Sequence, residues 1–541
     1  MSIRNLRLTY LLTACSVVWS CGLQAQPPAS SKSSAHPKLV LGIVVDQFRY
    51  DYTTRFAGRY TQGLHRLLSD GAVFVDAHQD HYPTVTATGH ATFMTGSIPA
   101  TSGIIGNEWY DRSSGRSVSS VEDGDTKLLG GTPNAVGSSP HNLLISTVGD
   151  EMKIANRGNS HIIGISMKDR AAILPVGRMA DAAYWFDDST GQVVSSSWYQ
   201  KQLPDWVNHF NAAKPAECEL GKAWNITGAA KPFVVLPKDP GKSYISAWET
   251  TPWSNDMLES FAEKALIEEH LGQNQAADML TVSFSANDHL GHSVGPDALA
   301  VEEMSVATDA AIGRLIAAAE RQVGKQNLLV VMTADHGVAP TPEFSVEHHL
   351  PGGRANKEAY SSIVQKALAA RFGEGKWIVG TWESGFYFNR ALLQDKKLNE
   401  EDVENEAAKA VATLPYVERA YTRVELMRRG AMATRVDDYV ARSFFPERGP
   451  DLFVIMKPYW LFGTEGSSHG SPWDYDTHVP LIFLGAGIRK GVYTDRVGIS
   501  DVAPTLALLL RVATPSGSIG RVLGEALKIS NHQARSAAAK R

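Results

Sequence analysis

Short apolar runs rich in β-branched residues alternate with longer helix-like segments along most of this chain, and this alternation constrains its fold most strongly. Residues 38–45 form a nearly continuous apolar run, as expected of a strand buried on both faces of a parallel sheet. Further strand-like runs occupy residues 162–167, 279–284, 328–332, 452–456 and 480–484. Helix-like segments occupy residues 52–68, 255–268, 298–319 and 502–510. The pattern predicts a doubly wound α/β fold with a mostly parallel sheet flanked by helices.

With 541 residues, the chain exceeds one ordinary core, so we expect a large α/β domain that carries insertions. Residues 38–336 and 451–530 are expected to form this main domain. The sequence pattern of residues 337–450 differs from the alternation in the rest of the chain. It predicts a small α+β insertion, with strand-like segments at 377–388 and 416–422 around a helix-like segment at 401–413. Residues 113–140 and 172–250 are expected to form loops over the functional face.

The first 25 residues have the features of a signal peptide. Arg4 and Arg7 precede a short apolar stretch, and residues 23–25 resemble a signal-peptidase site. The stretch is too short for a membrane span, so we expect an exported protein, periplasmic or secreted, with no transmembrane segment after cleavage. Cys15 provides an alternative, a lipoprotein site that would leave the product lipid-anchored. We expect a flexible spacer at residues 26–37 and a disordered tail at residues 531–541.

The net charge and the number of cysteines limit which partners the chain can bind and which side chains can hold a metal. The formal net charge is −5, which gives no basic footprint for a nucleic acid. Of three cysteines, only Cys218 lies beyond the leader, so a mature chain can form neither an internal disulfide nor a thiolate metal cluster. Any metal must therefore be held by histidines and carboxylates.

Acids and histidines fall directly beside the predicted strands. In open α/β sheets, ligands bind beyond the carboxyl ends of the strands, so residues at these places should meet at one edge. Each of these acids and histidines, taken alone, can be explained as a turn residue, a helix cap or a member of an ion pair. Their joint occurrence beside several strands predicts a site for two metals. The candidate ligands are Asp46, Asp288, His292, Asp335, His336 and His478.

A candidate nucleophile lies in residues 81–90, where Thr84, Thr86 and Thr88 precede a probable helix at residues 89–94. A hydroxyl at a helix N-terminus gains from the positive end of the helix dipole, and a nearby metal lowers its pKa further. The pattern does not choose among the three threonines.

Seven motifs, in this order, resemble a known family. They are Leu-Gly-Ile-Val-Val-Asp46, Pro-Thr-Val-Thr86-Ala-Thr-Gly-His90, Gly-Ile-Ile-Gly-Asn107, Lys168-Asp-Arg170, Asn-Asp288-His-Leu-Gly-His292, Asp335-His336-Gly and Asp476-Thr-His478-Val-Pro. They are similar to those of the alkaline phosphatase superfamily, and more narrowly of its phosphate-irrepressible, threonine-nucleophile monoesterase branch. The resemblance runs from about residue 38 to residue 512.

This resemblance implies a role for each matching residue. Thr86 would be the nucleophile, and Asn107, Lys168 and Arg170 would bind phosphate. Two zinc ions would be bound, one by Asp288, His292 and His478, the other by Asp46, Asp335 and His336 with Thr86 in contact.

The Lys168 and Arg170 pair favours a phosphate monoester as substrate. Two residues apart at the end of a strand, they should face the same side. Two zinc ions are balanced by three aspartates and a threonine alkoxide, which leaves these two cations to match a doubly negative ester. The sequence therefore predicts an exported dizinc alkaline phosphatase that hydrolyses small-molecule phosphate monoesters through a phosphothreonine intermediate on Thr86.

Two alternatives remain open. A phosphodiesterase or nucleotide pyrophosphatase on the same fold would use the same metals and threonine, but that branch lacks the Lys168 and Arg170 pair. A catalytically silent surface protein with the enzyme fold would not need about two zinc ions per chain. The physiological substrate and the oligomeric state are not determined by the sequence.

Overall fold

The computed structural model describes residues 36–133, 135–428 and 433–528. The predicted signal peptide, Cys15, the tail and all but two residues of the spacer lie outside these ranges. Within them, the search for a helix with the length and apolar character of a membrane span found none.

The main sheet has eleven strands in the order β22-β2-β21-β14-β1-β13-β8-β9-β10-β6-β7, and β22 (Gly491–Tyr493) is one of its two edges. In its centre, β1 (Leu39–Val45) lies between β13 (Asp278–Phe284) and β14 (Leu328–Thr333) and is parallel to both. The next strand beyond β13 is β8 (Ile162–Ser166), also parallel. All residues of β1 are buried, which explains its continuous apolar run. The predicted α/β class and parallel centre are confirmed.

The two flanks of the sheet contain antiparallel strands. On one side, β21 (Leu481–Gly485) runs antiparallel to both β14 and β2 (Ala72–Phe74). The other side contains β9 (Ala182–Asp187), β10 (Gln192–Ser196), β6 (Glu122–Leu129) and β7 (Val136–Ser138). Residues 113–140 and 172–250, expected as loops, therefore contribute four strands. Pairing at the sheet edge stabilises them, and short edge strands have a weak sequence signal.

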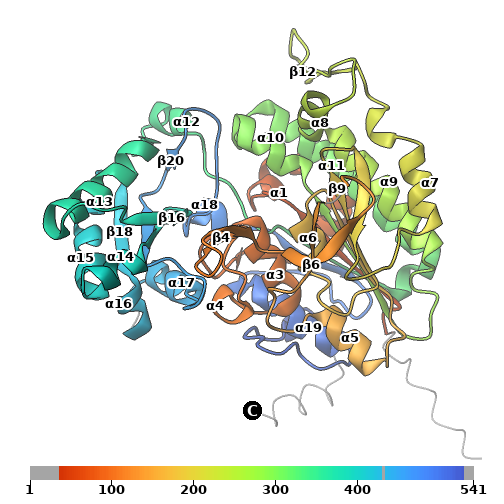
Figure 1. Cartoon of the computed structure of the whole chain (residues 1–541). Helices are drawn as coiled ribbons and strands as arrows, with labels where there is room; N and C mark the ends of the chain where they lie inside the picture. The colour runs from red at the N-terminus through yellow and green to blue at the C-terminus, as the bar shows by residue number, and fades with distance from the viewer. Residues whose placement is uncertain (1–35, 134, 429–432, 529–541) are drawn as a thin grey trace, which may run out of the picture.

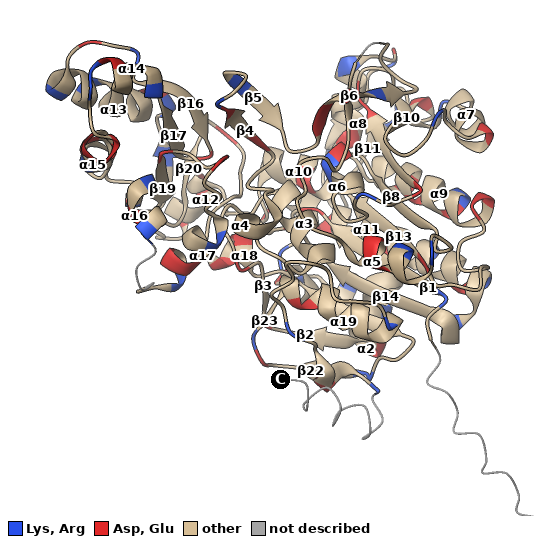
Figure 2. Cartoon of the chain, turned by 60° about the horizontal axis from the view of Figure 1, so that its bottom comes forward, with Lys and Arg blue, Asp and Glu red and all other residues tan. Residues whose placement is uncertain are grey.

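Helices pack in two groups with the main sheet between them (Figure 1). One group contains α9 (Pro252–Glu268), α11 (Leu299–Val323) and α2 (Gly63–Asp70). The other contains α3 (Thr86–Thr95), α5 (Val148–Ala155), α6 (Asp169–Ile173) and α19 (Val502–Leu510). Acidic and basic residues are intermixed along the helices, a pattern typical of solvated faces (Figure 2).

The helix predicted at residues 52–68 is broken into α1 (Tyr52–Arg55), a single 3₁₀ turn at Ala57–Arg59, and α2. The break has a tertiary cause. Asp309 of α11 accepts hydrogen bonds from the backbone N–H groups of Thr61, Gln62, Leu64 and His65. This carboxylate satisfies the free donors at the start of α2 and so fixes where that helix begins.

The insertion has a sheet and a core of its own, on the left of Figure 1. Its sheet has the order β16 (Ile378–Trp382), β17 (Gly385–Phe388), β19 (Leu452–Met456) and β18 (Val417–Thr422). The helices α13 (Lys357–Phe372) and α15 (Glu400–Val411) pack together beside it. Because β19 pairs with β17 and β18, the smaller sheet extends past the predicted boundary at residue 450. That boundary is corrected, since strand pairing rather than composition decides to which sheet β19 belongs.

Glu404 of α15 provides a test of the insertion's core. Its side chain is buried, its Oε2 accepts a hydrogen bond from the N–H of Val424, and burial raises its pKa from 4.5 to about 8. Between these two pH values the folded state keeps a proton that the unfolded state loses, so the free energy of unfolding falls as pH rises through this window. Glu404→Gln stays neutral. We therefore expect its stability relative to the parent protein to rise by at least about 1 kcal/mol between about pH 5 and about pH 8.5, measured from urea unfolding curves.

The matched control is Glu418→Gln, which alters an exposed glutamate of β18. Its relative stability should not depend on pH. An equal rise in both variants would contradict the assignment to Glu404.

Candidate active site

Three neighbouring parallel strands deliver acidic side chains to one edge of the main sheet. Asp46 follows β1, Asp288 lies in the first turn of α10 (Ala286–Val294) after β13, and Asp335 and His336 follow β14. The Nε2 atom of His336 lies 3.3 Å from Asp46 Oδ1 and 3.4 Å from Asp335 Oδ2. These residues meet because the carboxyl ends of adjacent parallel strands share an edge.

Three atoms of this first set that could bind a metal lie close together and form no hydrogen bond among the described residues. Asp46 Oδ1, Asp335 Oδ2 and His336 Nε2 are buried, and none has a hydrogen-bond partner among the described residues. Burial, followed by the charges of Asp288 and Asp335, raises the pKa of Asp46 well above its usual value. Unpaired buried acceptors are costly, and a carboxylate and imidazole set is suited to a divalent metal ion. The residues present therefore fit a metal.

A second set contains Asp288, His292 and His469. The Nε2 atoms of His292 and His469 lie 3.2 Å and 3.6 Å from Asp288 Oδ1. On the other side of each ring, Nδ1 lies within 3.0 Å of a backbone carbonyl oxygen, that of Ser467 for His292 and that of Thr84 for His469. A carbonyl that accepts from Nδ1 leaves the Nε2 lone pair free for a metal, as in many metal-ligating histidines.

The structure does not place His478 with Asp288 and His292, as the sequence had predicted. Its Nε2 lies 2.9 Å from the carbonyl oxygen of Val75, and its ring stacks between those of Tyr50 and His78. The prediction was reasonable because β21 runs antiparallel to β14, so the start of β21 lies at the functional edge. The ring is nevertheless turned toward neighbouring backbone, and a loop histidine takes the place beside Asp288.

The spacing of the sequence motifs gives His469 no ligand assignment and leaves it as a residue behind the ligands or on the surface. It lies in the Gly- and Ser-rich segment 466–471, and its ring stacks on that of His336 at a centroid separation of 3.5 Å. A histidine flanked by small residues is the sequence signal that could have marked it as a candidate ligand.

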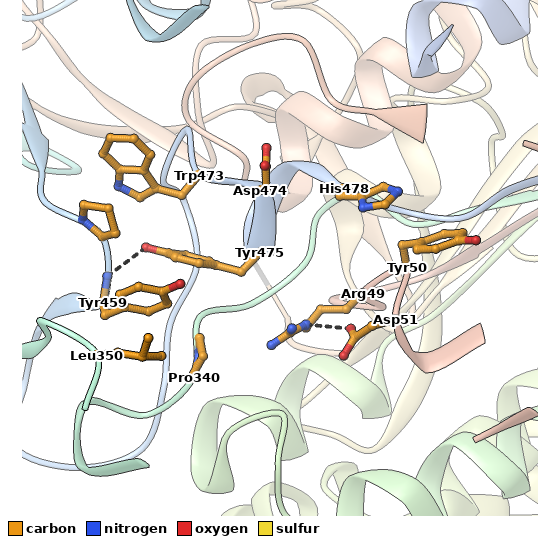
Figure 3. Close-up of a pocket in the computed structure, with 11 residues that line it drawn as sticks. Arg49, Tyr50, Asp51, Pro340, Leu350, Tyr459, Trp473, Asp474, Tyr475 and His478 are labelled. Atoms are coloured by element: carbon orange, nitrogen blue, oxygen red, sulfur yellow. Dashed lines mark hydrogen bonds and ion pairs between the residues drawn. The ribbon is translucent and has the colours of Figure 1, made fainter. Parts of the chain in front are cut away.

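His478 instead lines a cavity of about 530 Å³ that contains none of the residues of the two sets (Figure 3). Trp473 and Tyr475 contribute to the same cavity, and the Tyr475 hydroxyl accepts a hydrogen bond from the backbone N–H of Tyr459. The aromatic residues near His478 thus lie beside the acid and histidine cluster rather than within it.

Among the three candidate threonines, two are engaged with the main chain. The hydroxyl of Thr84 donates to the carbonyl of Ser471, and that of Thr88 donates to the carbonyl of Pro83. Thr86 is the first residue of α3, and its hydroxyl forms no hydrogen bond within the described part of the chain. Only Thr86 therefore combines a free hydroxyl with a helix N-terminus.

Asn107 lies beside this helix end. The N–H of Ala87 donates to Asn107 Oδ1 at 2.8 Å, which orients the side-chain amide. Because the oxygen is occupied in this way, the NH₂ group is left to donate elsewhere.

Lys168 lies between the acids of the two sets. Its Nζ atom is 2.6 Å from both Asp46 Oδ2 and Asp288 Oδ2. Although burial opposes it, the carboxylates of Asp288 and Asp46 raise the pKa of Lys168, and Lys168 in turn holds the pKa of Asp288 well below its usual value. The ammonium group is therefore fixed in its charged form.

Arg170 lies in the first turn of α6, not on an extended strand as predicted, because β8 ends at Ser166 and Lys168 caps α6. Its Nε atom is buried without a hydrogen-bond partner among the described residues. Lys168 and Arg170 are two residues apart at the start of α6, and the charge of Arg170 opposes the rise in the pKa of Lys168. The two residues therefore lie at a helix start instead of a strand end, and their joint binding of phosphate stays a prediction.

Comparison with known proteins now defines the class. Residues 40–479 match the family described as type I phosphodiesterase / nucleotide pyrophosphatase. The chain is similar to alkaline phosphatase PafA of Elizabethkingia meningoseptica, with 34% identity over 91% of this chain and 94% of that protein. It is also similar to alkaline phosphatase PhoV of Synechococcus elongatus, with 33% identity over 98% of this chain and all of that protein.

Structure comparison agrees. The crystal structure of alkaline phosphatase PafA superposes with a TM-score of 0.85 and 32% identity, covering 91% of this chain and 99% of that one. The fold and the matched family together identify the class of this protein as a phosphoesterase, and its candidate metal ligands agree with that class. The chain belongs to the alkaline phosphatase superfamily, in its threonine-nucleophile branch.

Gly89 of α3 allows a test of how closely this helix packs on the metal site. A Cβ atom at Gly89 would lie 2.2 Å from the backbone oxygen of Asp335. Backbone cannot yield as a flexible side chain can, so we expect Gly89→Ala to lower the free energy of unfolding by about 2 kcal/mol, measured by urea denaturation. This loss should occur although alanine is the better helix former.

Gly58→Ala is the control, since a Cβ atom there meets no atom within 4 Å. An unchanged unfolding midpoint in Gly89→Ala would show that α3 and Asp335 are not in close contact.

Proposed function

We propose that this chain is an alkaline phosphatase that hydrolyses phosphate monoesters with two zinc ions and a covalent phosphothreonine intermediate on Thr86. The observation that carries the proposal is the meeting of two carboxylate and imidazole sets at the sheet edge where α3 presents Thr86. Family membership supports the reaction class. The leader-like residues 1–25 lead us to propose export as well.

One zinc would be held by Asp46, Asp335 and His336 with Thr86, and the other by Asp288, His292 and His469. His469 replaces His478 in the set that the resemblance implied. When bound, the two ions supply Lewis-acid charge that lowers the pKa of a nearby hydroxyl and stabilises oxyanions during phosphoryl transfer.

Thr86 acts as the nucleophile in this proposal. Its hydroxyl loses its proton, and the oxygen attacks phosphorus in line with the ester oxygen, so that the Thr86 O–P bond forms as the P–O bond to the alcohol breaks. The N-terminus of α3 favours the negative charge of the alkoxide. Water then attacks the phosphothreonine, which releases inorganic phosphate and regenerates Thr86.

Lys168, Arg170 and Asn107 would bind the non-bridging oxygens. Asn107 donates through the NH₂ group that its bond to Ala87 leaves free, Lys168 provides a point charge, and Arg170 provides a two-pronged donor. Such preorganised donors stabilise the charge that develops in the transition state.

Zinc content tests the ligand assignment. We expect His469→Ala to retain about one zinc ion per chain after dialysis, and His478→Ala to retain about two, because His469 faces Asp288 and His478 does not. Elemental analysis of the purified variants measures this directly. Loss of zinc from His478→Ala with full retention in His469→Ala would restore the ligand set that the resemblance implied.

Substrate charge tests the choice between monoesterase and diesterase, since the family description includes phosphodiesterases. For Lys168→Ala/Arg170→Ala we expect kcat/KM to fall by at least about 100-fold on an aryl phosphate and by less than about tenfold on the matching aryl methyl diester. The diester carries one negative charge instead of two, so removing the cations should lower its kcat/KM less.

The control is Lys264→Ala/Arg321→Ala, a pair on α9 and α11 away from the site. Equal losses on both substrates in the Lys168 and Arg170 variant would favour the phosphodiesterase.

A further inference from the structure

A turn of the insertion lies against the segment that carries Thr86. Trp382 pairs with Gly385 across the β16–β17 hairpin, so Glu383 and Ser384 form a two-residue turn. The Trp382 ring packs edge-on against Tyr82 at 5.8 Å, just before the threonine segment. Its Nε1 lies 2.9 Å from where a Cβ atom on Gly106 would be, next to Asn107. The turn is therefore anchored beside both the proposed nucleophile and a proposed phosphate ligand.

Glu383 directs its carboxylate from this turn toward the site. Its Oε2 lies 3.4 Å from the Cβ position of Gly470, and that same position lies 3.5 Å from Val85 Cγ1. Gly470 follows His469, and Val85 precedes Thr86. The side chain is exposed to solvent, so it borders the open side of the site rather than its core.

The backbone at Glu383 supports a role for this side chain. Its φ is +46°, in a two-residue hairpin turn where glycine is the favoured residue. Such conformations of non-glycine residues cost free energy and tend to persist at functional sites.

This rim of the site carries negative charge without a matching cation. Glu108, which follows Asn107, is also exposed. Neither carboxylate takes part in an ion pair within the described residues, whereas Glu343 elsewhere in the chain is paired with Arg354. Both exposed carboxylates are therefore available to a ligand.

We propose that Glu383, assisted by Glu108, makes this site select phosphate monoesters whose alcohol portion carries a positive charge, such as esters of amino alcohols. This inference rests on the proposed function. With the phosphoryl group held by Lys168 and Arg170, the alcohol portion extends toward the open rim. An ammonium group there pairs with Glu383, a neutral alkyl group gains nothing, and a carboxylate is repelled.

Three esters of similar size test the selection at alkaline pH and low salt. They are phosphoethanolamine, propyl phosphate and phosphoglycolate, whose alcohol portions are cationic, neutral and anionic. We expect kcat/KM to fall in that order, with the cationic ester preferred over the neutral one by about threefold, a value typical of a solvent-exposed ion pair. This preference should shrink at high salt, since screening weakens exposed charges.

Glu383→Gln keeps the size of the side chain and removes its charge, so the ratio of the cationic to the neutral ester should approach one. The matched control is Glu268→Gln, which should keep the ratio of the parent protein. Glu268 is the last residue of α9, at the end of that helix that leads to the opposite edge of the sheet. A ratio of one in the parent protein, or an equal ratio in Glu383→Gln and the parent, would overturn the inference.

Two further measurements separate this inference from the proposed function. Hydrolysis of an aryl phosphate reports on phosphatase activity itself, so activity there with no preference among the three esters overturns only the inference. If no ester is hydrolysed, the binding of 2-aminoethylphosphonate and propylphosphonate to the zinc-loaded protein, measured by calorimetry, still tests the proposed preference for a cationic group. Tighter binding of the cationic phosphonate, lost in Glu383→Gln, supports the inference, and equal binding refutes it.

Discussion

The concentration of three carboxylates at one edge of the main sheet is the constraint on which the rest of the site depends. Asp46, Asp288 and Asp335 are buried and close together, so each raises the cost of ionising the others. Lys168 compensates part of this charge by contacting two of them at 2.6 Å. The negative charge that Lys168 does not balance favours the binding of cations. The atoms of the first set that form no hydrogen bond are arranged to bind one.

The elements around these acids are packed closely enough to hold them in place. Gly89 brings α3 against the backbone of Asp335, and His90 on the next position lies 3.3 Å from Asp335 Oδ2. The same helix presents Thr86 at its N-terminus. Packing of one short helix therefore links the proposed nucleophile to the proposed metal ligands, which is the preorganisation that phosphoryl transfer requires.

The insertion stands in a different relation to this chemistry. One part of its hydrophobic core is separate, whereas side chains such as Trp382, Tyr387 and Phe453 belong to the core of the main domain. The turn that carries Glu383 follows Trp382 and so lies where the two parts pack together. In the proposed function, the main domain would supply the reacting groups, and the insertion would border the space for the alcohol portion of the ester. In such an arrangement, substrate preference can change through the insertion without disturbing the metal ligands.

The sequence alone determined the central strands, the α/β class, the family and five of the acids and histidines, because these residues adjoin strands whose apolar runs are unmistakable. Tertiary structure alone decided which loop histidine faces Asp288, since His469 and His478 differ in ring direction rather than in local pattern. It likewise separated Thr86 from its neighbours through their hydrogen bonds, and it assigned β19 to the smaller sheet through pairing. Local patterns report burial and strand position, whereas the direction of a loop side chain and the partner of a strand depend on residues far away in the chain.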